Sequence, residues 1–154
     1  MIDFFLKKKG LRVRVAAIIH DPKGKVLLIQ QKKHGNGYWL LPGGGIEFGE
    51  SAEDALKREL KEELDLVVLS SHFLFLNESI DPKKKRHLIQ LNFQVKVREL
   101  VPKLNQKEQA ISGFGFFTGK EIQNMDLRPD TKEFFKSKAP KAGIYYQSKW
   151  VAEP

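Results

Sequence analysis

Three glutamates lie close together in one short segment, at positions 59, 62 and 63. If this segment is an α-helix, its rotation of ~100° per residue places Glu59, Glu62 and Glu63 within about one third of the circumference. Carboxylates on one face repel one another, and a hard divalent cation such as Mg²⁺ or Mn²⁺ prefers oxygen ligands of this kind. The alternative is a solvated acidic face with Arg58 and lysines as partners.

A run of three glycines precedes the glutamates. Gly43, Gly44 and Gly45 follow a proline, and glycine lets the backbone approach a metal ion or a phosphate without side-chain clash. Ser51 is a suitable N-cap, and strong helix formers fill most of the positions up to 64, so we predict a helix over 51–64. A glycine loop, a capped helix and clustered glutamates together favour a site for metal and phosphate.

The segment 44–66 resembles the Nudix box, Gly-x5-Glu-x7-Arg-Glu-U-x-Glu-Glu-x-Gly-U, in which U is a bulky aliphatic residue. Gly44 and Glu50 stand at the first spacing, and the run 58–63 supplies the second part. One specified position differs, because Asp65 replaces the second glycine. Asp tolerates the left-handed conformation expected just past a helix better than most residues, so we expect a small stability penalty and intact chemistry.

This resemblance implies an α/β fold, a Nudix-type α/β/α sandwich with a mixed β-sheet, in a single domain over residues 1–154. It also implies metal-dependent hydrolysis of a pyrophosphate bond in a nucleoside diphosphate linked to a moiety X. ADP-ribose or another nucleotide sugar is the first expectation for X. Oxidised nucleoside triphosphates, dinucleoside polyphosphates and 5′-triphosphorylated RNA ends are alternatives. A non-catalytic, nucleotide-sensing Nudix domain is an alternative to an enzyme, although such domains commonly lose box glutamates that this chain retains.

The resemblance also assigns the metal site, which would hold Mg²⁺ or Mn²⁺. The implied ligands are the carboxylates of Glu59, Glu62 and Glu63 and the carbonyl of Gly43. Glu50 would be a structural partner of the junction between loop and helix.

The general base is left open by the box, because family members use either a box glutamate or an acid from a later loop. Glu62 is the first choice and Glu108 the choice outside the box, although Glu108 is also readily explained as an ordinary loop residue. Arg58 would orient the glutamates or contact phosphate. Glu62, Arg58 and Glu108 are therefore the candidate catalytic residues.

Residues outside the glutamate cluster would select the substrate. The candidates are Arg12 and Arg14 on the first predicted strand, Gly44 in the loop, and Arg86 at the start of a later strand. The arginines could contact phosphate or base, or be plain surface residues. Tyr38 could stack a base, although core packing is the commoner role of an aromatic side chain.

Apolar patterns predict strands over 12–20, 25–31, 67–76, 87–97 and 113–117, and short helices near 118–121 and 130–137. A turn signal over 21–24 predicts that the first two strands form a hairpin. Apolar residues alternate strictly with polar ones between Ile89 and Val97, so we expect that strand to have one buried and one polar face.

Composition narrows the class of protein. The chain has 154 residues, 41% of them hydrophobic, which is too apolar for a disordered chain. It has no cysteine, so disulfides, thiolate metal sites and a cysteine nucleophile are excluded. No apolar run approaches the roughly 18 residues of a membrane-spanning helix. The order of charges at the N-terminus is not that of a secretory signal, and we expect a cytoplasmic location with no membrane partner.

A formal net charge of +8 and a pI near 9.6 suggest anionic partners. The lysine clusters at 7–9 and 83–86 lack interleaved aromatics, so nucleic acid is an unlikely partner and a nucleotide-type small molecule is expected. A basic nucleic-acid-binding domain with an incidental acidic helix is the third class considered. The aromatic tail near Trp150 could serve a homodimer or close the core.

Overall fold

The computed structural model describes residues 10–33, 35–107, 110–136 and 143–151. A five-stranded mixed sheet has the order β4-β1-β6-β5-β8, and a three-stranded antiparallel sheet has the order β3-β2-β7. In the larger sheet, β1 with β6 and β5 with β8 are the parallel pairs. Its strands are β1 (Leu11–Ile18), β4 (Gly43–Gly45), β5 (Val68–Ile80), β6 (His87–Val97) and β8 (Ile144–Ser148).

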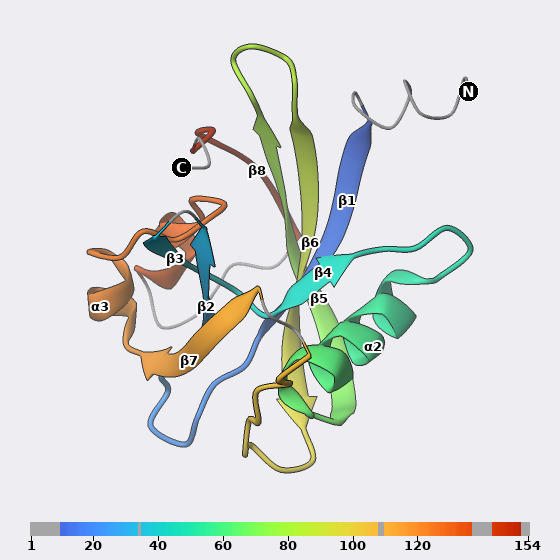
Figure 1. Cartoon of the computed structure of the whole chain (residues 1–154), viewed down its shortest axis with the longest axis vertical. Helices are drawn as coiled ribbons and strands as arrows, with labels where there is room; N and C mark the ends of the chain where they lie inside the picture. Colours follow the sequence, from blue (N-terminus) through green and yellow to red (C-terminus); the bar gives the residue numbers. More distant parts are fainter. Residues whose placement is uncertain (1–9, 34, 108–109, 137–142, 152–154) are drawn as a thin grey trace.

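The smaller sheet and the helices flank this central sheet. The smaller sheet contains β2 (Val26–Lys33), β3 (Asn36–Leu40) and β7 (Ile111–Phe117), and the helices are α2 (Ala52–Leu64), α3 (Gly119–Ile122) and the 3-10 helix η1 (Lys132–Phe135). Figure 1 shows α2 beside β4 and β5, with the smaller sheet and α3 on the opposite side of the molecule. The predicted α/β fold with a mixed sheet is confirmed.

Helix α2 begins and ends where the sequence predicts. The hydroxyl of Ser51 accepts the backbone N–H of Asp54 at 3.1 Å, which satisfies an otherwise unpaired donor of the first turn. Asp65 follows the helix in the left-handed conformation, with φ of 55°. The helix therefore ends without the glycine that the motif specifies.

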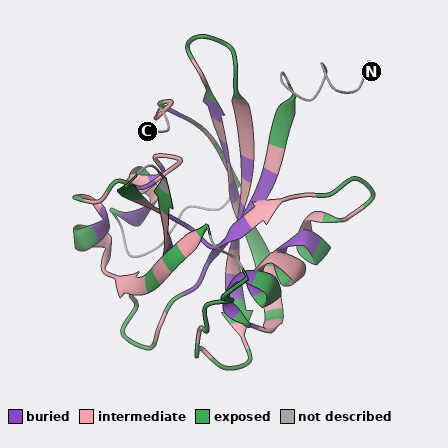
Figure 2. Ribbon diagram, in the orientation of Figure 1, coloured by how far each residue is buried: buried purple, intermediate pink, exposed green. Residues whose placement is uncertain are grey.

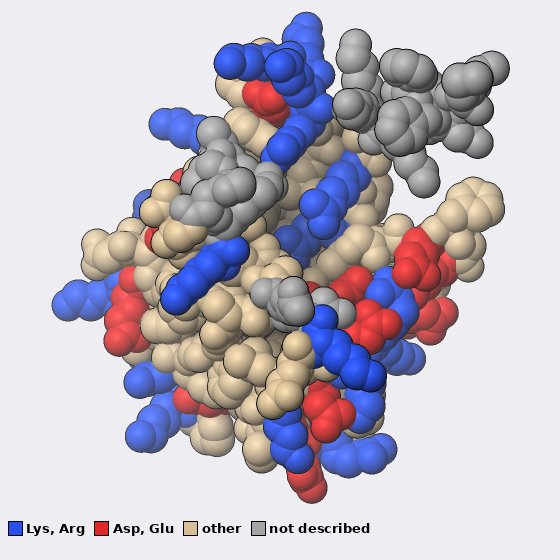
Figure 3. All heavy atoms as spheres, viewed as in Figure 1, with Lys and Arg blue, Asp and Glu red and all other residues tan. Residues whose placement is uncertain are grey.

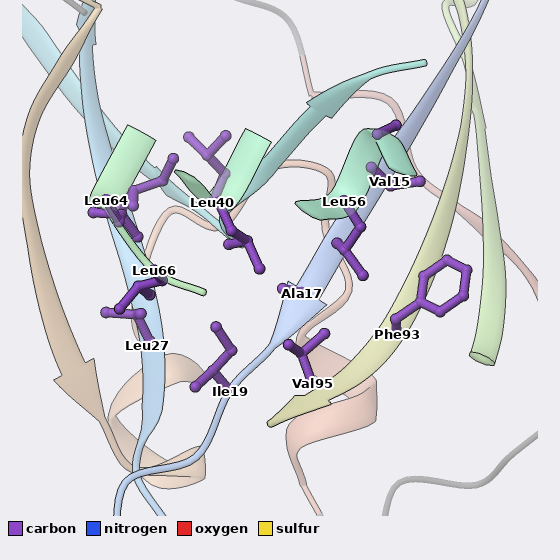
Figure 4. Packing of buried hydrophobic residues seen from close by; sticks show 13 residues of the cluster. Val15, Ala17, Ile19, Leu27, Leu40, Leu56, Leu64, Leu66, Phe93 and Val95 are labelled. Atoms are coloured by element: carbon purple, nitrogen blue, oxygen red, sulfur yellow. The ribbon is translucent and has the colours of Figure 1, made fainter. Parts of the chain in front are cut away.

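A stripe of leucines attaches α2 to the central sheet. Leu56, Leu60 and Leu64 are fully buried and belong to one cluster with side chains from β1 and β6. Figure 4 shows Leu56 and Leu64 pointing toward this cluster, which also contains Val15 and Phe93. Burial of a leucine side chain contributes about 1.5–3 kcal/mol. This packing fixes the orientation of the helix and thereby directs Glu59 and Glu63 toward β4.

The predicted hairpin of the first two strands is wrong. The turn forms as expected, with Gly24 donating to the Asp21 carbonyl at 2.9 Å, but β1 and β2 belong to different sheets. Only a bridge between His20 and Val26 joins the two strands. Strand β1 pairs with β4 and β6 instead, and from Arg14 onward it is buried on both faces inside the larger sheet.

The predicted polar face of β6 is also wrong, although its bounds are confirmed. Gln90 and Asn92 are buried, with 1% and 0% exposure. Phe75, the cross-strand neighbour of Asn92, packs in a second apolar cluster with residues from α3, η1 and the loops beside them, so this face is covered too. Figure 2 shows buried segments where β1, β5 and β6 lie side by side, and an exposed tip on the β5–β6 hairpin.

The predicted glycine loop is wrong, because Gly43–Gly45 forms strand β4 against β1, and the remaining predictions differ in their ends. Strand β5 extends to Ile80, and β7 starts at Ile111. Thr118 and Glu121 form the predicted capping box of α3, whereas Thr131 makes no side-chain cap and starts only one turn of 3-10 helix. Within the described ranges, no helix is long and apolar enough to cross a membrane.

Candidate active site

Arg58 holds several acidic groups around one guanidinium. Its Nε and Nη2 donate to the two carboxylate oxygens of Glu50 at 2.7 and 2.9 Å. Its Nη1 donates to Glu59 at 2.9 Å and to Glu62 at 3.3 Å, and its Nη2 also reaches the Gly45 carbonyl at 3.1 Å. The arginine therefore ties the helix to the glycine strand β4.

The three glutamates of the cluster differ in exposure. Glu63 is 7% exposed and accepts the backbone N–H of Gly43 at 3.1 Å. The side chain of Glu59 is 16% exposed, and that of Glu62 is 49% exposed. Glu59 and Glu63 therefore face the interior of the site, whereas Glu62 lies at its solvent edge.

Glycine at position 44 makes room for Glu59. A Cβ at Gly44 would collide with the carboxyl group of Glu59, whereas a Cβ at Gly45 would meet nothing nearer than 4.0 Å. Gly43 has φ of 147°, and a Cβ there would strike the backbone of Val15 in β1. The glycines thus let β4 lie between β1 and the carboxylates.

The charges of the site shift one another's pKa values. Hydrogen bonds from Arg58 hold the pKa of Glu50 down at about 2, and the same bonds raise the pKa of Arg58. Burial lowers the pKa of Arg14 to about 10, while the charge of Glu63 opposes this shift. Glu50, Arg58 and Arg14 are therefore charged at neutral pH.

A cleft of about 290 Å³ adjoins these residues and contains three arginines, Arg12, Arg14 and Arg128. Figure 3 shows basic side chains in the hollow between the β5–β6 hairpin and an acidic patch over α2. The other residues of the cleft come from both sheets, the helix and the last segment: Gln31, Tyr38, Leu40, Gly43, Gly44, Gly45, Glu59, Glu63, Ser79, Leu88, Pro129, Trp150 and Val151. Cationic and anionic side chains thus share one concave surface.

The structure brings most of the predicted site residues to this cleft, but not all. Glu62 contacts Arg58 from outside it, and Arg86 is an exposed residue of the β5–β6 hairpin that does not line the cleft. Glu108, the candidate base outside the box, falls outside the described residues.

Ser79 and Trp150 are cleft residues that were not predicted from their sequence context, whereas Arg128 belongs to the segment 126–129, which resembles a late loop of ADP-ribose-type family members. Ser79 and Trp150 have no motif around them. Arg128 is placed by the loop after α3, where its backbone N–H donates to the Trp39 carbonyl at 2.8 Å. Its guanidinium lies 4.7 Å from the ring centre of Tyr38, an arrangement typical of cation–π pairs. Only pairing of this loop with β3 brings the two together.

The oxygen donors of the site are of the type that a hard divalent cation prefers. The space at Gly44 keeps the Glu59 carboxylate close to the backbone of β4. Within the described part of the chain, no three acidic or histidine side chains form a ready cation site, because Arg58 draws Glu59 and Glu62 to itself. The donor chemistry fits a cation, and in this structure Glu59 and Glu62 pair with Arg58 instead.

Comparison with known proteins identifies the family to which the chain belongs. The NUDIX domain family profile matches residues 10–137, and the chain belongs to this family. Nudix hydrolases generally use divalent metal ions.

A crystal structure of a MutT NUDIX hydrolase from Burkholderia pseudomallei superposes with a TM-score of 0.64 and 26% identity, covering 73% of this chain and 86% of that one. An RNA pyrophosphohydrolase from Ruthia magnifica is 47% identical over 66 residues, 43% of this chain and 34% of the relative. An ADP-ribose pyrophosphatase from Methanocaldococcus jannaschii is 35% identical over 92 residues, 57% of this chain and 54% of the relative. The chain thus spans about a third to a half of these curated relatives.

Proposed function

We propose that the chain is a metal-dependent pyrophosphohydrolase that cleaves a nucleoside diphosphate linked to a moiety X. One observation carries the proposal: the carboxylates of Glu59 and Glu63 line the same cleft as Arg12, Arg14 and Arg128. A pyrophosphate repels an anionic nucleophile, so its hydrolysis needs cationic groups on the phosphates and carboxylates that hold a metal ion. The cleft provides both kinds of side chain side by side.

The proposed ligands of Mg²⁺ or Mn²⁺ are Glu59, Glu62, Glu63 and the carbonyl of Gly43. When bound there, the ion would neutralise phosphate charge and lower the pKa of a water molecule. Arg58 is the positioning residue, because it contacts Glu59 and Glu62 and attaches them to β4 through the Gly45 carbonyl.

The arginines of the cleft bind phosphate in this proposal. Buried Arg14 is held by the Leu41 carbonyl at 3.2 Å and stays charged at neutral pH, since the pKa near 10 is well above 7. Arg12 lies two residues away on the same face of β1, where it extends the positive surface toward solvent. Glu62 is the proposed general base, because it is the exposed carboxylate beside the site, and Glu108 is the alternative.

We propose ADP-ribose or another nucleotide sugar as the first candidate substrate. The relative named an ADP-ribose pyrophosphatase, 35% identical over 92 residues, supports this choice. The relatives named RNA pyrophosphohydrolase favour a triphosphorylated RNA end as the second candidate. We further propose that residues 1–154 form one domain, since segments from both sheets and from the helix line the cleft.

Phosphate-coupled turnover with Mg²⁺ tests the proposal on a panel of ADP-ribose, nucleotide sugars, 8-oxo-dGTP, diadenosine polyphosphates and triphosphorylated RNA. We expect Glu59→Gln and Glu63→Gln to lower kcat by about 100-fold or more on the preferred substrate, since each change removes an anionic ligand. Glu53→Gln, an exposed position on the same helix, is the matched control and should keep full activity. Full activity of both site variants would contradict the metal-site assignment.

A further inference from the structure

Arg14 has a buried side-chain nitrogen that lacks a hydrogen-bond partner among the described residues. Its Nη2 donates to the Leu41 carbonyl at 3.2 Å, whereas its Nε has no acceptor there. The residue is 8% exposed, and burial lowers its pKa only to about 10, so the guanidinium is charged at neutral pH. A buried cation with an unpaired N–H is unfavourable, and such groups are rare in folded proteins. The unpaired Nε therefore calls for an acceptor close by.

The strand register places an acceptor beside it. Arg14 in β1 is the direct partner of Gln90 in β6, and Gln90 is the direct partner of Asn77 in β5. Side chains of direct partners point to the same face of a sheet, so the three form one row. Gln90 Oε1 and both amide atoms of Asn77 are buried and also lack partners within the described residues. The row therefore contains unpaired donors and unpaired acceptors side by side.

This row lies behind the surface of the cleft. Four side chains of the central sheet line the cleft, and we call them its floor: Arg12, Arg14, Leu88 and Ser79. Gln90 and Asn77 are the next residues on the same face of β6 and β5, but they are 1% and 0% exposed and do not line the cleft. A ligand in the cleft therefore meets Arg14 and not the two amides.

The amide of Gln90 is held in one orientation. Asn92, on the same face of β6, donates through Nδ2 to the carbonyls of Phe75 and Gln90, each at 3.3 Å. Only the NH₂ group of an amide can donate to a carbonyl, so Asn92 Oδ1 is left to accept Gln90 Nε2 at 2.8 Å. This bond uses the donor end of Gln90 and leaves Oε1 as the acceptor without a partner.

We propose that Gln90 positions the guanidinium of Arg14: its Oε1 accepts from Arg14 Nε through an ordered water molecule that Asn77 also binds. This inference rests on the proposed function, because that function gives Arg14 the phosphate of the substrate. Neighbouring strands lie about 4.8 Å apart, and a bridging water is nearly as favourable as a direct hydrogen bond. A buried water has about three polar partners, and these three side chains supply them.

Two contacts would then fix the guanidinium, the Leu41 carbonyl on Nη2 and the water on Nε. Because Arg14 lines the cleft, they would hold its charge at the place of the phosphate before substrate binds. A side chain that is already ordered loses less conformational entropy on binding, so the contacts would strengthen phosphate binding.

A crystal structure of the free chain that shows ordered water tests the bridge directly. We expect a water molecule within about 3 Å of both Arg14 Nε and Gln90 Oε1. A structure without it would overturn the inference.

Binding of methylenediphosphonate, a pyrophosphate analogue that cannot be hydrolysed, tests the effect on Arg14. Calorimetry with Mg²⁺ would compare the native chain with Gln90→Met, which keeps the size of the side chain and removes the acceptor. We expect the Kd to rise about tenfold, the effect of one hydrogen bond to a charged group. Asn77→Leu should raise the Kd in the same direction. It serves if Gln90→Met does not fold, since Asn77 has no side-chain bond to lose in the described part of the chain.

A double-mutant cycle separates positioning from a general structural effect. If Gln90 acts through Arg14, Gln90→Met should change the Kd by less than about twofold in a chain that already carries Arg14→Met. Gln94→Leu is the matched control, because it breaks the bond of another amide on the same face, to the Ile18 carbonyl at 3.2 Å. It should lower the Tm and leave the Kd within about twofold of the native value.

An unchanged Kd in both Gln90→Met and Asn77→Leu, or an equal loss with and without Arg14, would overturn the inference. Failure of the proposed hydrolysis gives a different pattern. A chain that shows the expected changes in Kd but hydrolyses nothing on the substrate panel retains this inference and loses the proposed function. An active enzyme whose Kd is native in both variants loses only the role of Gln90.

Discussion

At the residue scale, the adjacent glycines Gly44 and Gly45 of β4 have different structural roles. A side chain at Gly44 would occupy the place of the Glu59 carboxylate, whereas one at Gly45 would meet open space. The φ angles of both lie outside the left-handed region, so alanine is conformationally acceptable at either. Alanine substitutions at the two positions therefore distinguish the loss of space beside Glu59 from the general effect of a methyl group in β4.

We predict that Gly44→Ala lowers kcat at least about tenfold, because a displacement near 1 Å in a catalytic site commonly costs more than that. Gly45→Ala should retain nearly native turnover. Both variants should fold, as judged by circular dichroism and Tm. Equal activity of the two variants would show that the position of Glu59 against Gly44 does not matter for the reaction.

The junction of loop and helix is the element that carries the glutamates. Arg58 in α2 binds Glu50 in the preceding loop through two hydrogen bonds, and Glu50 also accepts the backbone N–H of Glu47 at 3.0 Å. These contacts lower the pKa of Glu50 from 4.5 to about 2. Folding therefore favours the charged carboxylate.

The pH dependence of stability follows from that shift. The contribution of Glu50 is complete above pH 4.5 and is lost as the pH falls toward about 2, because the folded protein must then bind a proton that its unfolded chain already holds. We predict that the native Tm exceeds that of Glu50→Gln near neutral pH and that the difference shrinks through this acid range. A constant gap between native and Glu50→Gln would contradict the prediction.

The sequence predicted an element correctly when the pattern that defines the element lies in neighbouring residues. Ser51, Thr118 and the alternation from His87 to Val97 are local, and they predicted the helix starts and the bounds of β6. The sheet to which β1 belongs depends on residues far along the chain. For the same reason Gln90 was expected on a polar face: its burial comes from elements that pack over β6, and alternation cannot show which face they cover.

The residues of the candidate site also differ in whether their sequence signal is local. The glutamates and glycines were predictable, because their spacing along one helix and one loop carries the signal. Arg128 and Tyr38 are 90 positions apart and meet only through pairing of the loop after α3 with β3. The floor of the cleft depends on register across β1, β6 and β5.

The positive charge is a property of the whole molecule, and part of it lies away from the cleft. The tip of the β5–β6 hairpin carries Lys83, Lys84 and Lys85, all exposed, and Figure 3 shows basic side chains gathered there. Leu88 is the residue of β6 that lines the cleft, and it follows Lys85 by three residues, a separation of up to about 10 Å. This is comparable to the Debye length of about 8 Å at physiological salt, so the charge of the lysines is partly screened at the cleft. At that distance they act weakly on a small nucleotide in the cleft.

We predict that replacing these three lysines with glutamine leaves kcat/KM for the preferred small nucleotide within about twofold at physiological salt, since screening weakens their field. The decisive comparison uses triphosphorylated RNA, whose chain would leave the cleft and could reach the hairpin. If a small nucleotide is the substrate, RNA should be the poorer one in both proteins. RNA turnover that is high in the native chain, lost in the triple variant and steeply dependent on salt would instead assign the hairpin to RNA binding. Only a polyanion offers the protein enough phosphates to give such a salt dependence.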